Sequence, residues 1–314
     1  MGNNACSPSP ETIDSVFWAG QAGGIIPDIT LDRSLSNYLS LNSSFALNSQ
    51  YAAIQRHLSK DRLAVLDSNL TSIFGHSSRV SYGGVGIVAL ALSFLLDTLV
   101  GQTSDPYQRI FGPDYSSEIP TVAREYLTQV PWKVNDSDGM AEMTEIYDQK
   151  LKYALIELYE NMTIDHHLNT AAIKQWINGA AIHLHMRIHG IRMFSVPKGS
   201  AESLRLSYRT GLGRVLQLYT GYLRRNVKER SATLDPSIKA GFLITEPSKK
   251  VRHRVVHNAC QTQSIIGAVV ARILAAQNVR TTETFFDEPA RLIDKFVRQR
   301  EHFELPTRNA SRHS

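Results

Sequence analysis

Apolar residues recur every three to five positions along much of the chain, with polar residues between them. In residues 138–162, for example, Met143, Ile146, Leu151 and Leu155 follow this spacing. Such a repeat places the apolar side chains on one face of a helix. The segments that this pattern predicts to be helical are 51–73, 82–100, 117–129, 138–162, 169–194, 200–230, 248–277 and 289–303.

Signals for β-strands are weak by comparison. Alternating runs of Val, Ile, Thr and Tyr bounded by turns are nearly absent, and residues 232–247 contain Pro236, Gly241 and Pro247, which favour a connection. Long periodic segments joined by short connections predict an all-α, multi-helix, bundle-like globular fold.

The two ends of the chain differ from its middle. Residues 1–12 and 306–314 are polar and contain proline, so we expect disordered N- and C-terminal tails. Residues 13–305 are expected to form a single helical domain, and a subdivision near 162–199 is the alternative.

The most apolar stretch, residues 80–96, carries no formal charge. A helix that crosses a membrane needs about 20 apolar residues, and the strongly apolar part here covers only residues 87–96. We therefore expect a buried core helix. The alternative is a pore-forming or membrane-inserting segment within residues 80–100. The residues that would enter lipid are Ile87, Leu90, Leu92, Phe94 and Leu95.

The first seven residues, MGNNACS, resemble a substrate pattern for N-myristoylation. Removal of Met1 would expose the amine of Gly2, and Cys6 stands where a second, palmitoyl chain is often attached. The pattern departs from the common form, because Ser7 stands one place after the position where Ser or Thr is usual. One myristoyl chain anchors a protein only marginally, so a second chain or a basic patch is needed.

Charge is distributed unevenly along the chain. Residues 1–160 contain 10 Lys and Arg against 18 Asp and Glu, whereas residues 161–314 contain 24 against 11. The two halves can attract one another within one fold, or the second half can present a basic surface to phosphate groups. The overall formal charge of +5 conceals this difference.

Two basic runs stand out in the second half. Residues 224–230 are expected to close a helix, where cations suit the helix dipole. Residues 249–254 are expected to begin another helix, and the helix dipole disfavours cations at that end. That placement points to an anionic membrane surface as the partner of Lys249, Lys250, Arg252 and Arg254. Nucleic acid is not an expected partner, because no recognisable nucleic-acid-binding module occurs.

Three histidines lie close together in the segment AIHLHMRIHG. His185 and His189 are four residues apart, on one helical face, and could bind zinc together with a ligand from residues 165–167. The zincin pattern is not met, because Met186 follows His185 where that pattern has Glu. A metal-dependent enzyme around this pair is therefore an alternative and not the main hypothesis.

No other motif indicates catalysis. The chain has no phosphate-binding P-loop, no dinucleotide-binding glycine motif and no nucleophile elbow. Its two cysteines cannot build a disulfide framework, which favours a reducing compartment. We expect a non-enzymatic helical protein without a cofactor, acting at the cytosolic face of a membrane. It would work as an interaction or regulatory protein with an unknown protein partner, and its oligomeric state is not determined by the sequence.

Overall fold

A computed structural model describes residues 9–24, 26, 28–75, 79–101, 105–113, 117–164, 170–193, 196–230, 240–246, 251–257 and 262–305. The fold is all-α and multi-helical, as predicted, with small sheets added to it. The helices are α1 (Pro10–Ala22), α2 (Arg33–Tyr38), α3 (Ser43–His57), α4 (Lys60–Phe74), α5 (Gly86–Leu99), α6 (Pro106–Phe111), α7 (Ile119–Lys133), α8 (Ser137–Ile164), α9 (Thr170–Arg192), α10 (Gly199–Asn226), α11 (Thr262–Ala276), α12 (Val279–Asp287) and α13 (Pro289–Arg298). The strands are β1 (Arg79–Val80), β2 (Val227–Arg230), β3 (Ala240–Glu246), β4 (Val251–His257) and β5 (Phe303–Glu304).

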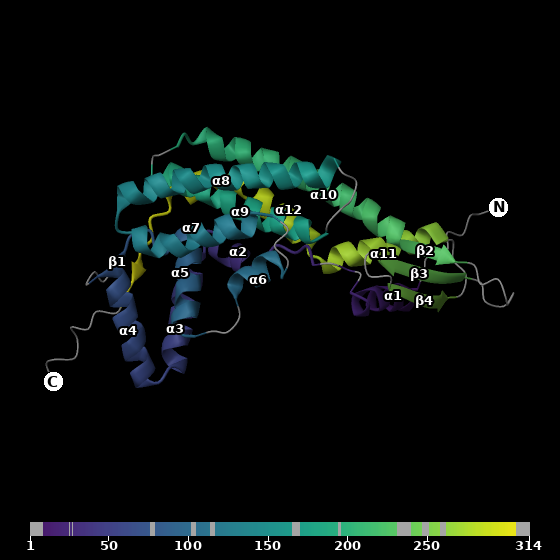
Figure 1. Cartoon of the computed structure of the whole chain (residues 1–314), viewed down its shortest axis with the longest axis horizontal. Coiled ribbons are helices and arrows are strands. Elements are labelled where there is room, and N and C mark those ends of the chain that lie inside the picture. The colour runs from purple at the N-terminus through teal and green to yellow at the C-terminus, as the bar shows by residue number, and fades with distance from the viewer. Residues whose placement is uncertain are drawn as a thin grey trace.

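Helix α9 forms the centre of the larger, helical body. It contacts α5, α6, α7, α8, α10 and α13, and nearly all of its described side chains are buried. Because helices surround it, its polar residues Asn178 and His183 are buried too, and both are hydrogen-bonded inside the core. Figure 1 shows α7, α8 and α10 running alongside it, while α3 and α4 project from one end of the body.

Helix α5 lies in this core, as the main interpretation of residues 80–100 predicted. Ile87, Leu90, Leu92 and Phe94 are almost completely buried, and Leu95 is partly buried against the same core. Among the residues that the structure describes, no helix is long and apolar enough to span a membrane.

The opposite end of the molecule combines α1 and α11 with a three-stranded antiparallel sheet in the order β2-β3-β4 (Figure 1). Arg272 of α11 donates a hydrogen bond of 2.8 Å to the Asp14 carboxylate of α1, and its guanidinium lies 4.2 Å from the centre of the Phe17 ring. These contacts hold α1 against α11, and α1 in turn contacts β3 and β4.

This sheet corrects three local predictions. Residues 248–277 do not form one helix, because β4 precedes α11, and the helix expected to reach residue 230 ends at Asn226 and continues into β2. The connection at residues 232–247 contains β3. In residues 251–255, Arg alternates with Val or His, which is a strand pattern of period two that the helical prediction overlooked.

Other helix boundaries also differ from prediction, and the helix predicted at 289–303 ends at Arg298, before strand β5. The segment 51–73 belongs to two helices, α3 and α4, because the hydroxyl of Ser59 accepts a hydrogen bond from the Arg62 N–H and caps the start of α4. Residues 10–12, expected in the disordered tail, form the first turn of α1, where Pro10 follows the capping residue Ser9.

Candidate functional site

The three-stranded sheet brings the two basic runs of the sequence together. Leu243 of the central strand pairs with Lys228 on one side and with Arg254 on the other. Directly opposed residues of an antiparallel sheet lie on the same face, as do residues two apart along a strand. Lys228, Arg230, Arg252 and Arg254 therefore occupy one face of the sheet.

The other face of the sheet holds a different set of residues. Val227 and Ile244 are paired there, as are Phe242 and Val255. Val227 is buried in the hydrophobic core, and the sheet contacts α1, α10 and α11. The acidic residues of these three strands, Glu229 and Glu246, also fall on the Val227 face by register. The cationic face thus contains no acidic residue from these strands.

This arrangement alters the sequence argument for a basic site. Arg252 and Arg254 lie in strand β4, so the unfavourable helix dipole on which that argument rested does not exist. Lys249 and Lys250 lie outside the described residues. Lys228 and Arg230 were missed as members of the site, because the periodicity assigned them to the end of a helix.

The predicted lipidation sites, Gly2 and Cys6, lie outside the described residues. They precede α1, whose first residue is Pro10 and which packs against β3 and β4.

The three histidines of α9 lie in three different environments. His183 is completely buried, with its Nδ1 hydrogen-bonded to the Tyr208 hydroxyl of α10 and its Nε2 3.1 Å from Asp148 Oδ1 of α8. Arg187 donates a hydrogen bond of 2.8 Å to the same carboxylate. Burial raises the pKa of Asp148, but the hydrogen bonds from His183 and Arg187 outweigh it and bring the pKa below 3.8.

His185 packs among aromatic rings. Its imidazole contacts Phe285 and Phe296 with ring centres 5.6 and 5.3 Å apart, respectively. Burial, followed by the charge of Arg192, lowers its pKa to about 3. No cluster of three metal-ligating side chains occurs among the described residues, and residues 165–167 lie outside them. The zinc hypothesis for His185 and His189 therefore stays a prediction.

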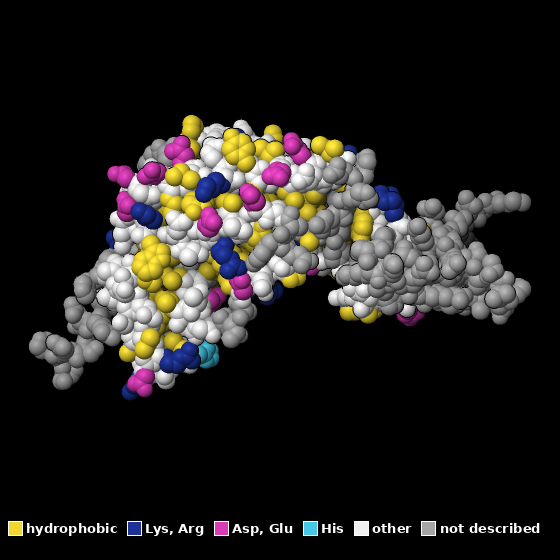
Figure 2. Space-filling model, viewed as in Figure 1, with side chains coloured by type: hydrophobic (Ala, Val, Ile, Leu, Met, Phe, Trp, Pro, Cys, Tyr) yellow, Lys and Arg dark blue, Asp and Glu magenta, His cyan; other side chains and the backbone are white. Residues whose placement is uncertain are grey.

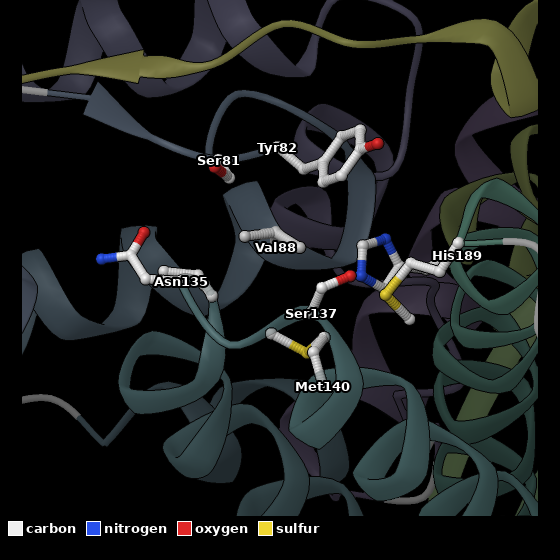
Figure 3. Close-up of a pocket in the computed structure, with 9 residues that line it drawn as sticks. Ser81, Tyr82, Val88, Asn135, Ser137, Met140 and His189 are labelled. Atoms are coloured by element: carbon white, nitrogen blue, oxygen red, sulfur yellow. The ribbon is translucent and has the colours of Figure 1, made fainter.

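His189 lines a small cavity at the end of the helical body that carries β1. Figure 3 shows its imidazole facing Val88 of α5 and Ser137 and Met140 of α8. The cavity has a volume of about 190 Å³. Its lining residues are Ser81, Tyr82, Val88, Val134, Asn135, Ser137, Met140, His189 and Met193.

A larger apolar groove lies on the surface between α8 and α10, with Trp176 of α9 among its lining residues. Figure 2 shows apolar side chains gathered over these helices, and Ile156 and Leu206 of the groove are exposed to 44% and 59%. Its volume of about 670 Å³ is within the range of small-molecule sites, roughly 300–1,000 Å³.

Comparison with known proteins adds no family assignment. No family model, curated protein or solved structure matches the chain.

Proposed function

We propose that this protein is a non-enzymatic interaction or regulatory protein that binds the cytosolic face of an anionic membrane. Acylation of Gly2, and of Cys6, would supply one membrane signal, and the cationic sheet face would supply the other. The observation that carries the proposal is the strand register, which puts Lys228, Arg230 and Arg254 on one face together with Arg252.

The energies of the two signals support their combination. Each Lys or Arg near an anionic bilayer contributes about 1 kcal/mol, so four such residues contribute about 4 kcal/mol. A myristoyl chain alone gives only marginal, reversible binding. The proposed acyl sites precede α1, which packs against the sheet, so both signals would act from the same end of the molecule.

Vesicle flotation of the purified, non-acylated full-length chain tests the cationic face. We expect binding to vesicles containing 30% phosphatidylserine, with loss of binding in high salt, since exposed charges are screened. Lys228→Glu combined with Arg254→Glu should weaken binding at least about tenfold. The matched control is Lys60→Glu with Lys150→Glu, which makes the same change in net charge at exposed positions on α4 and α8. If the two double substitutions weaken vesicle binding equally, binding depends on net charge alone, and the sheet face is not the binding site.

Metabolic labelling with an alkyne myristate in cells, followed by fractionation, tests the acyl signal. We expect Gly2-dependent label and membrane recovery, with Gly2→Ala shifting the protein to the soluble fraction. Cys6→Ser should keep the label while lowering membrane recovery. A Gly2→Ala variant that partitions like the parent protein would contradict the lipid part of the proposal.

A further inference from the structure

The cavity lined by His189 carries an inference that is independent of membrane binding. It lies between β1, α5, α8 and α9, at the end of the molecule opposite the cationic sheet (Figures 1 and 3). Asn135 and Ser137 at its edge are exposed, whereas His189, Met140 and Val88 are buried. The cavity therefore has an accessible mouth and a buried interior.

The hydrogen bonding of His189 defines which of its ring nitrogens carries the proton. Arg192 NH1 lies 3.0 Å from His189 Nδ1, and a guanidinium nitrogen can only donate. Nδ1 is therefore the acceptor, and in the neutral ring the proton is on Nε2. Burial, and then the charge of Arg192, lower the pKa of His189 well below 6.5, which keeps the ring neutral.

This Nε2–H group lacks an acceptor in the part of the chain that the structure describes. It is buried and has no hydrogen-bond partner among the described residues. A buried donor left without an acceptor costs about 1–3 kcal/mol. An oxygen atom of a ligand in the cavity would remove that cost.

Arg192 adds positive charge directly behind His189. Its side chain is 1% exposed, and its NH2 donates a hydrogen bond of 2.8 Å to the carbonyl oxygen of Phe296. Within the described part of the chain, no carboxylate forms an ion pair with it. Burial, and then the charge of Arg300, lower its pKa to about 10, so the guanidinium remains charged at neutral pH. The charge of Glu301 raises this pKa in part, but a buried guanidinium without an ion-pair partner is costly, and an anion nearby would offset that cost.

The size and walls of the cavity narrow the class of anion. Its volume of about 190 Å³ is below the range of drug-sized ligands. Val88, Val134, Met140 and Met193 give it an apolar wall. A phosphate would place several oxygens against this wall, whereas a carboxylate with a short alkyl chain presents oxygen to the donor and carbon to the wall.

We propose that this cavity binds a short-chain monocarboxylate, with one carboxylate oxygen accepting the Nε2–H of His189 and the alkyl chain packed against Val88 and Met140. Ser137, the first residue of α8, places the positive end of that helix dipole at the mouth.

Titration calorimetry of the purified full-length protein with butyrate tests the site. We expect saturable binding, at least tenfold weaker for neutral butyramide and undetectable for inorganic phosphate. Ser137→Phe should block the mouth and abolish binding, whereas Ser203→Phe, at an exposed position on α10, should leave it unchanged. His189→Leu removes the donor and should weaken binding at least tenfold. His189→Gln keeps an amide N–H near the Nε2 position and should retain binding within a few-fold.

Several outcomes would overturn the proposal. The first two are absence of saturable butyrate binding and equal affinity for butyrate and butyramide. The others are tighter binding of phosphate than of butyrate, and a Ser137→Phe variant that binds butyrate as well as the parent protein does. If His189→Leu fails to fold, the Ser137→Phe and Ser203→Phe pair decides alone, because both positions are exposed and neither contacts Arg192.

Discussion

Arg187 of α9 donates hydrogen bonds to both carboxylate oxygens of Asp148 on α8, through Nε to Oδ1 at 2.8 Å and through NH2 to Oδ2. Asp148 is buried, and it also meets the imidazole of His183. One carboxylate thus connects two long helices of the body and compensates a partly buried guanidinium.

We expect Asp148→Asn to lower the free energy of unfolding by about 3 kcal/mol, because it leaves Arg187 without its counter-charge. Urea denaturation followed by circular dichroism measures this. Glu145→Gln, at an exposed position on the same helix, is the control and should change stability by less than about 0.5 kcal/mol. Similar losses of stability in the two variants would show that the loss in Asp148→Asn does not come from the buried network of Asp148, His183 and Arg187.

Stability should fall in acid because of the buried imidazole of His185. Its pKa of about 3 in the folded protein compares with an ordinary value of 6.5, so only the unfolded chain binds a proton between these values. The stability that the neutral His185 imidazole contributes is fully present above pH 6.5. It is lost as the pH falls toward 3, and the free energy of unfolding then decreases by up to about 1.4 kcal/mol per pH unit. Urea unfolding between pH 7 and 4 should give a shallower slope for His185→Leu than for the parent. An unchanged slope would contradict the buried neutral imidazole, and substitution of exposed His57 is the control.

Two helical glycines should respond to alanine in opposite directions. A β-carbon on Gly179 of α9 would lie 2.5 Å from Cγ2 of Ile119, whereas one on Gly213 of α10 would have no neighbour within 4 Å. We expect Gly179→Ala to destabilise the protein by about 1–3 kcal/mol through overpacking. Gly213→Ala should stabilise it by about 0.5–1 kcal/mol, because alanine restricts the unfolded chain. Thermal unfolding of both variants measures this, and a shift in the same direction would refute the close approach of α7 and α9.

Truncation within α5 should be costly. Leu92 is 1% exposed in the core, so Leu92→Ala should lower the free energy of unfolding by about 2–5 kcal/mol. Leu95→Ala, at a partly buried position on the same helix, should cost less. Chemical denaturation measures the free energy of unfolding of the two variants. A larger decrease for Leu95→Ala than for Leu92→Ala would contradict the placement of α5.

The spacing of apolar residues determined the all-helical class and the positions of the long helices. The segments 138–162 and 169–194 correspond to α8 and α9 within a few residues. Helical hydrogen bonds join residues four apart, so a local pattern carries the information. Burial of the apolar residues 87–96 likewise followed from their short length.

The tertiary structure decided the features that depend on contacts between distant segments. Lys228 and Arg254 share a face only because both pair with Leu243, and strand pairing between separated segments leaves no periodic trace within one segment. The three α9 histidines look alike in the sequence, but their surroundings differ. His183 contacts Tyr208, His185 contacts Phe285 and His189 contacts Arg192. The local pattern could place these imidazoles on a helix, but their chemistry depends on packing partners that only the folded chain supplies.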